Sequence, residues 1–166
     1  MRRVFAVFAA LLVLVVVTQF FLAASGAFDT APKDESFQPH RALGYAILLF
    51  AVLLTIVAAL ARMPRRLVGM TGLVAGLTVG QALIGALADG FNGTDGTSTT
   101  AGQLIFGLHA VNGLAIMTVA ATVARKARAL SRSAVADRYA GTSGNPGAAA
   151  SGTAAGREDT MREGGI

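Results

Sequence analysis

The residues VFAVFAALLVLVVVTQFFLAA, from Val4 to Ala24, decide the fold of this chain, because 21 successive residues carry no charged side chain. An α-helix needs roughly 20 apolar residues to cross the hydrocarbon core of a bilayer. Three further uncharged, apolar stretches follow along the chain. The sequence therefore predicts an all-α integral membrane protein, a bundle of four transmembrane helices at about 4–24, 40–62, 67–88 and 104–125.

The composition agrees with a membrane protein. The 166 residues are 54% hydrophobic and only 14% charged, and their mean hydropathy is positive. Soluble domains carry about 25% charged residues. Cysteine is absent from the chain, which excludes disulfides, thiolate metal sites and cysteine nucleophiles.

The net charge of +5 follows from how basic residues are distributed. They precede the first stretch, fill the short link Arg62–Arg66 and follow the fourth stretch, whereas the other two loops hold most of the acidic residues. The positive-inside rule then places both termini and this link in the cytoplasm. We expect a multi-pass protein of the plasma membrane whose partner is the lipid bilayer, and no nucleic-acid binding.

The first stretch also resembles a secretory signal, since Met1-Arg-Arg precedes it and small residues end it at 23–27. Signal peptides have apolar regions of roughly 7–15 residues. The longer run favours a retained helix, with cleavage as the alternative.

The transmembrane domain is expected to cover residues 1–128, followed by a basic and then disordered cytoplasmic tail at 129–166. From Ala140 the tail is rich in Gly, Ala, Ser and Thr and shows no apolar periodicity, which is typical of disorder. The loop at 89–102 is expected to be mobile and contains a glycosylation-like motif at 92–94. Before the second helix, Ser36 is expected to act as N-cap and Pro39 to lie in the first turn.

A short pattern occurs twice, and it suggests a parallel repeat of two-helix units. Each unit has a glutamine near the end of its first helix, then a polar loop, then His-x-x-x-Gly. The residues are Gln19, His40 and Gly44 in the first unit and Gln81, His109 and Gly113 in the second. No other histidine occurs in the chain.

The third stretch also carries a glycine stripe, Gly72-x-x-x-Gly76-x-x-x-Gly80, which is a close-packing pattern of membrane helices. We expect it to seat this helix inside the bundle, with homodimerisation as the alternative.

Helix geometry gathers the polar intramembrane residues into one layer in the outer leaflet. This layer contains Gln19, His40, Arg41, Tyr45, Gln81, His109 and Asn112. Polar residues in membranes usually face the bundle interior and often mark function. The leading hypothesis is a b-type haem bound by His40 and His109 as axial ligands to the iron.

Other residues of the layer have expected supporting roles. Gly44 and Gly113 would admit the porphyrin, and Arg41 would pair with a propionate. Gln19 and Gln81 would hold the second imidazole nitrogens. The alternative is that the histidines and Asn112 only order the bundle through hydrogen bonds between helices; another metal, proton or quinone role is a third. No catalytic residue is predicted.

The stretches FQPHRALGY, from Phe37, and FGLHAVNGL, from Phe106, resemble a bacterial family of small four-helix membrane proteins without an assigned function. This resemblance covers about residues 1–128 and implies the fold and the membrane location. More distantly, the chain resembles one half of haem A synthase and the cytochrome b561 class. Haem A synthase has a carboxylate three residues before its first ligand, where this chain has Phe37. That resemblance therefore implies haem binding rather than oxidation of a haem methyl group.

Overall fold

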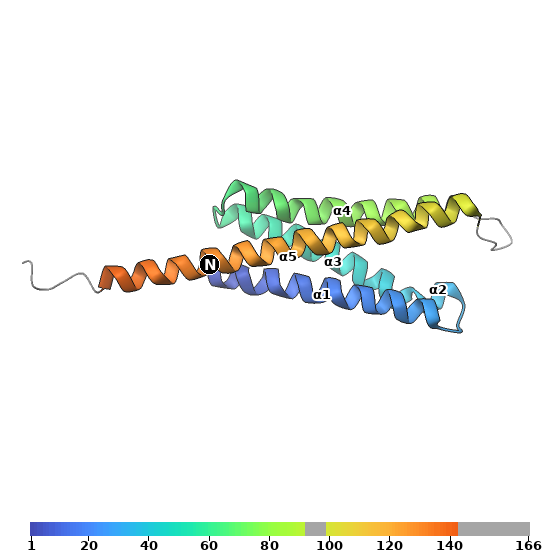
Figure 1. Ribbon diagram of the computed structural model, residues 1–166, viewed down its shortest axis with the longest axis horizontal. Helices are drawn as coiled ribbons and strands as arrows, with labels where there is room; N and C mark the ends of the chain where they lie inside the picture. The colour runs from blue at the N-terminus through green and yellow to red at the C-terminus, as the bar shows by residue number, and fades with distance from the viewer. Residues whose placement is uncertain (92–98, 143–166) are drawn as a thin grey trace, which may run out of the picture. The chain divides into compact units, whose positions relative to one another are not determined.

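The computed structural model describes residues 1–91 and 99–142, with side chains described up to residue 133. This part of the chain is helical and has no strand, which confirms the all-α prediction (Figure 1). The helices are α1 (Arg2–Phe28), α2 (Lys33–Ser36), α3 (Gln38–Leu60), α4 (Arg65–Gly90) and α5 (Thr100–Thr142). Four of them are long and apolar enough to cross a membrane, with α2 adding one turn before α3.

Helix α3 has the predicted length and lies two residues earlier, whereas the other three long helices, α1, α4 and α5, exceed the predicted stretches, most clearly α5. This helix was expected to end near residue 125 but continues to Thr142. Its added segment is rich in Ala and Arg, which favour helices regardless of hydropathy. The disorder predicted from Ala140 is therefore wrong for residues 140–142, while 143–166 and the motif at 92–94 lie outside the described residues. Met1–Ser131 form one compact unit, and the rest of α5 belongs to a second.

The connection between α1 and α3 corrects one expectation. Ser36 does not cap α3, because its hydroxyl donates to the carbonyls of Ala31 and Pro32, at 2.9 and 3.1 Å. Phe37 takes the N-cap position without a side-chain hydrogen bond, and a proline lies in the first turn of α3 as predicted. The Ser36 hydroxyl thus bonds within the α2 segment instead of capping α3.

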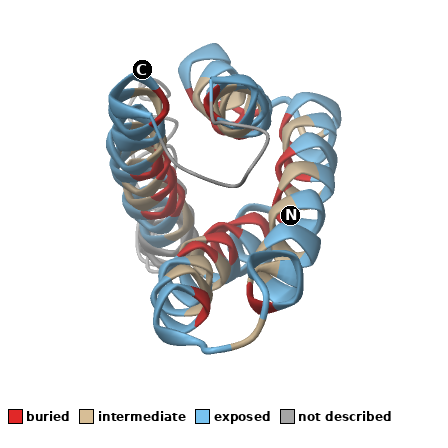
Figure 2. Ribbon diagram, turned by 90° about the vertical axis from the view of Figure 1, so that its right-hand side faces the viewer, coloured by how far each residue is buried: buried red, intermediate tan, exposed pale blue. Residues whose placement is uncertain are grey.

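The four long helices of the first unit pack around a common core. α3 lies beside α1 and beside α4, so α3 and α4 form the hairpin that their short link predicts. α5 touches α4 through Asn112 and α1 through Phe20, whose ring lies over Gly113. Buried residues face the interior (Figure 2). α3 and α5 therefore occupy diagonal positions, separated by α1 and α4.

The outward surfaces of the helices remain apolar. Phe21, Leu49, Leu83 and Val111, one from each long helix, are 60–70% exposed. Large exposed apolar surfaces mark contact with a membrane or a partner. Together with the lengths of the four spans, this exposure is compatible with a surrounding bilayer.

Buried hydroxyl groups in the spans are satisfied within their own helices. Thr71 is fully buried and donates to Val68, and Thr78 donates to Val74, each at 2.8 Å from the carbonyl oxygen. Such bonds leave no polar group exposed to hydrocarbon. These threonines need no further partner, so the polar chemistry concentrates elsewhere.

The glycine stripe of α4 splits between different neighbours. A Cβ added at Gly72 would lie 3.7 Å from Thr55 of α3, and one at Gly80 would lie 3.7 Å from Asn112 of α5. At Gly76 it would meet nothing within 4 Å. The stripe thus contacts two helices within the bundle, and homodimerisation through it stays a prediction.

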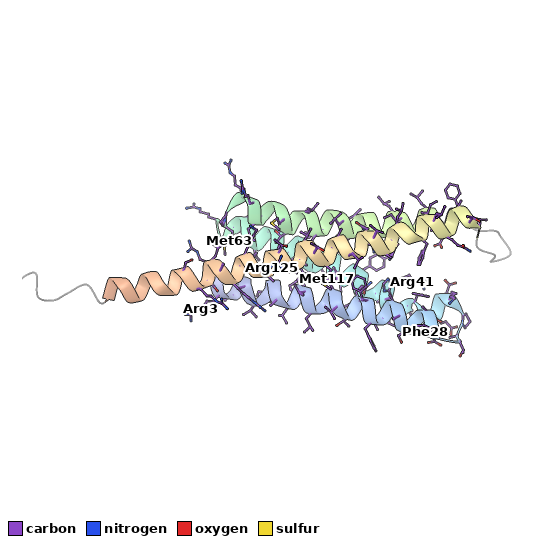
Figure 3. All side chains as sticks on the ribbon, viewed as in Figure 1. Arg3, Phe28, Arg41, Met63, Met117 and Arg125 are labelled. Atoms are coloured by element: carbon purple, nitrogen blue, oxygen red, sulfur yellow. The ribbon has the colours of Figure 1, made fainter. Side chains whose placement is uncertain are left out.

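The two ends of the first unit differ in their residues. One end, here called the α2 end, contains Phe28 and Arg41, and the other contains Arg3 and Met63 (Figure 3). At the latter end Arg62 has a φ of 50° in the turn between α3 and α4. A left-handed backbone at a non-glycine residue is strained. This conformation of Arg62 lets the chain turn within the short link between α3 and α4.

Candidate functional site

The candidate site is a polar layer within the bundle, toward the α2 end, which we call the histidine layer. Each long helix contributes half-buried polar side chains to it. Its members are Gln19 of α1, His40 of α3, Gln81 of α4, and His109 and Asn112 of α5. Residues up to 93 positions apart in sequence thus meet at one level, as the repeated pattern predicts.

His40 is held by Gln19 through both ring nitrogens. Its Nδ1 lies 3.2 Å from the backbone oxygen of Gln19, and its Nε2 lies 3.3 Å from the side-chain nitrogen. The Gln19 amide also donates to the backbone oxygen of His40 at 2.8 Å. The consistent arrangement has the proton on Nδ1, donated to the carbonyl, and the Nε2 lone pair accepting from the amide. Gln19 therefore orients this imidazole, with its backbone at Nδ1 and its side chain at Nε2.

The two imidazoles lie close together inside the bundle. The ring centroids of His40 and His109 lie 6.1 Å apart, with 46° between the ring planes. Since α3 and α5 are diagonal, these rings meet at the centre of the layer rather than along one helix interface. Both histidines thus belong to a single site.

Each histidine also contacts a phenylalanine three residues before it. Phe106 stacks on His109 with a centroid distance of 5.3 Å and only 4° between planes, and Phe37 meets His40 edge-on at 6.1 Å. In the sequence, Phe37 stands out only as the position of a missing carboxylate, and Phe106 was not among the predicted site residues. The signal was present in the repeat, which reads Phe-x-x-His-x-x-x-Gly in both units.

Gln81 does not copy the side-chain role of Gln19. Its Oε1 accepts a hydrogen bond of 2.6 Å from the Nδ2 of Asn112, which also donates to the Leu77 backbone oxygen at 2.8 Å. The backbone of Gln81 lies beside the His109 ring. The side-chain oxygen of Gln81, however, is bonded to Asn112. The structure therefore does not show the expected hydrogen bond from the Gln81 side chain to His109.

The glycines one turn below the histidines are covered by side chains. A Cβ at Gly44 would lie 3.4 Å from the Gln19 amide nitrogen, and one at Gly113 would lie 3.4 Å from the Phe20 ring and 3.6 Å from the Gln81 amide nitrogen. These glycines thus admit two glutamines and a phenylalanine. The notches expected to face a porphyrin are filled in this structure.

Arg41 is directed away from the histidine layer. Its guanidinium donates to the backbone oxygen of Asp34 and lies 3.7 Å from the carboxylate of the same residue. Asp34 is almost fully exposed. Arg41 therefore fastens α3 to the short helix α2, and its expected role toward a propionate finds no contact in the layer.

Two buried polar side-chain atoms in the described residues have no hydrogen-bond partner, and both belong to this layer. They are Oε1 of Gln19 and Nδ1 of His109. Buried polar groups are hydrogen-bonded in the great majority of cases, and an exception calls for a water, an ion or a ligand. The layer can therefore accept a further polar group.

The donor set limits which metal centre could bind. Among the described residues no three His, Cys, Asp or Glu side chains gather where they could hold a metal ion. A structural zinc site needs four protein ligands, and a catalytic one needs three. Haem iron needs only axial ligands from the protein, so two imidazoles form a sufficient set for haem.

Comparison with known proteins covers part of the chain. Residues 19–87 are similar to a family of unknown function (DUF6220). The matched segment is less than half of the chain; it includes Gln19, His40 and Gln81 and ends before His109. It agrees with the resemblance to a family without an assigned function and gives no support for a relationship to haem A synthase or cytochrome b561. No curated protein and no solved structure gives a significant match.

Proposed function

We propose that this membrane protein binds one b-type haem between His40 and His109 and serves in electron transfer or haem handling. The observation that carries the proposal is the pair of neighbouring imidazoles, 6.1 Å apart between centroids. A bound haem would supply one-electron chemistry. The residues of this chain would supply the two axial ligands and an apolar surrounding.

The separation of the rings fits this use. An imidazole nitrogen binds a metal at about 2.0 Å and lies roughly 1.2 Å from its ring centre, so two opposed ligands have centres about 6.4 Å apart. The observed 6.1 Å is close to this distance. The angle of 46° between ring planes does not oppose this use, because an imidazole that held an iron would be able to rotate about that bond.

Support for the ligand orientation comes from Gln19. Histidines that bind metals almost always donate their other ring N–H to a carbonyl, a carboxylate or water. The Gln19 backbone oxygen lies 3.2 Å from Nδ1 of His40 and leaves Nε2 for the iron. On binding, the Gln19 amide must release Nε2, and Phe20 must move from Gly113 to make room for the porphyrin.

The second candidate function is structural, and these same contacts favour it. Both ring nitrogens of His40 already have partners, and both glycine notches are filled. In that case the histidine layer only sets the register of the helices, through hydrogen bonds that are worth about 0.6 kcal/mol each in membranes. The protein would then be a non-enzymatic accessory component of the membrane.

An absorbance spectrum separates the two candidates. The full chain, expressed with added haem precursor and purified in detergent, should show a Soret band and the α and β bands of reduced b-type haem. The control replaces both histidines by alanine and should lose these bands, since the chain has no other histidine. If the original protein shows no Soret shift even after haemin addition, the haem function is wrong and the structural function stands.

The orientation is a further part of the proposal. We place both termini and the Arg62–Arg66 link on the cytoplasmic side of the plasma membrane, supported by the basic residues at that end of the bundle. The histidine layer would then lie near the outer face. Reporter fusions to residue 166 and to the loop at 92–98 test this topology, and a reporter that is active outside only at the C-terminus would overturn it.

A further inference from the structure

The two halves of the histidine layer are unequal. His40 has a partner at each ring nitrogen, at 3.2 and 3.3 Å, both supplied by Gln19. The His109 ring lies beside the Gln81 backbone, but its buried Nδ1 has no partner at hydrogen-bond geometry within the described residues. The repeat therefore produces two similar helix positions with different hydrogen bonding.

The cause of this inequality is one residue of the repeat. Three positions after His109 stands Asn112, whereas Leu43 occupies the corresponding position after His40. Asn112 donates to Oε1 of Gln81 at 2.6 Å. A leucine cannot form this bond, so in the first unit the glutamine side chain is free to reach the histidine. Asn112 thus engages the side-chain oxygen of Gln81, and Gln81 approaches the second imidazole through its backbone.

Stacking adds a second difference. Phe106 lies parallel to the His109 ring, at 5.3 Å between centroids, and so supports it on one face. His40 receives only an edge-on contact from Phe37. The ring of His109 is therefore positioned by packing and by the Gln81 backbone, and within the described residues no side-chain amide is hydrogen-bonded to it. The ring of His40 is positioned by hydrogen bonds from Gln19, one of which a ligand at Nε2 must break.

We infer that His109 is the primary ligand of this site and that His40 is a latched, exchangeable second ligand, with Gln19 as the latch. The inference rests on the proposed haem function and deepens it. His109 would hold a haem first, and His40 would become the second ligand only once the Gln19 amide leaves its Nε2. Gln19 and Asn112 act on the iron through the histidines and are positioning residues.

The test is haemin titration of the full-length protein in detergent, with the spin state read from the absorbance spectrum. His40→Ala should keep haem on His109 as a five-coordinate, high-spin species that added imidazole converts to low spin. His109→Ala should weaken haemin binding at least tenfold more than His40→Ala does. Equal weakening by both substitutions would overturn the inference while leaving the haem function intact.

Two further substitutions address the latch. Releasing one hydrogen bond is worth about two- to tenfold in an equilibrium constant, so Gln19→Leu should raise the low-spin fraction by that factor. Asn112→Leu copies the first unit and should weaken haemin binding by a similar factor, because it frees Gln81 to occupy His109. A lower low-spin fraction in Gln19→Leu, or tighter haemin binding in Asn112→Leu, would contradict the role of Gln19 as the latch.

A measurement on the haem-free protein keeps the two proposals distinguishable. Imidazole ¹⁵N NMR should show His40 locked with its proton on Nδ1, and Gln19→Leu should release this tautomer. His109, which lies beside the Gln81 backbone rather than a side-chain amide, should show weaker locking. If the original protein binds no haemin, the proposed function and the ligand order both fail, and the NMR result reports separately on the Gln19 latch. If both rings are locked alike, the ligand order is wrong even where haem binds.

Discussion

Gly26 is the position where a single methyl group should do most harm at the α2 end. A Cβ added there would lie 2.7 Å from the Ser36 carbonyl oxygen, roughly 0.7 Å closer than ordinary contact. The clash involves backbone rather than a flexible side chain, so α2 must shift. Overpacking of this kind costs about 1–3 kcal/mol. Gly26→Ala should therefore lower the free energy of unfolding despite the better helix propensity of alanine.

The matched control for this change is Gly69→Ala, because an added Cβ there meets nothing within 4 Å. It should leave stability unchanged or raise it by up to about 1 kcal/mol. Both variants would be unfolded in detergent by SDS titration and followed by circular dichroism. If Gly26→Ala proves as stable as Gly69→Ala, the close approach of α1 to α2 is wrong.

The same substitution also reaches the histidine layer. The added Cβ at Gly26 would lie 3.3 Å from the Phe37 ring, which packs edge-on against His40. The displacement should therefore loosen the His40 ring as well as the α2 turn. In the NMR measurement, the His40 tautomer should lose its locking in Gly26→Ala and keep it in Gly69→Ala.

Three other substitutions test separate parts of the fold by the same SDS titration. Asn112→Ala removes two hydrogen bonds to α4 and should cost about 1–2 kcal/mol; an unchanged midpoint would contradict those bonds. Arg62→Gly should stabilise the protein by up to about 1 kcal/mol by relieving the positive φ, whereas Arg62→Ala should not. Arg41→Ala should change stability by less than about 0.5 kcal/mol, because its partner Asp34 is 97% exposed; a larger loss would assign Arg41 a role beyond this pair.

The sequence predicted the helices well because a membrane span can be recognised from its composition alone. A long uncharged run such as Val4–Ala24 is stable in a bilayer as an α-helix, because a helix satisfies its backbone N–H and C=O groups within the segment. The end of α5 was missed because hydropathy reports only the part of a helix in contact with lipid. The residues that follow Arg125 include many that favour helices, but several are charged, so hydropathy does not detect them.

The histidine layer was predicted in outline but not in its contacts. Spacing alone brought Gln19 and His40 together, because both lie near the same ends of neighbouring antiparallel helices. Spacing could not assign the partner of Gln81, because an amide can bond to several groups within its reach. In the structure its side-chain oxygen accepts a hydrogen bond from Asn112. The stacking of Phe106 likewise depends on a rotamer, which spacing does not determine.

The most direct test of the central claim is the electron paramagnetic resonance spectrum of the ferric, haem-reconstituted full-length protein, recorded with its haem content. The account predicts about one haem per chain and a low-spin signal typical of two imidazole ligands, which disappears when both His40 and His109 are replaced by alanine. A purely high-spin signal in the original protein, or protein that retains no haem after reconstitution, would contradict it.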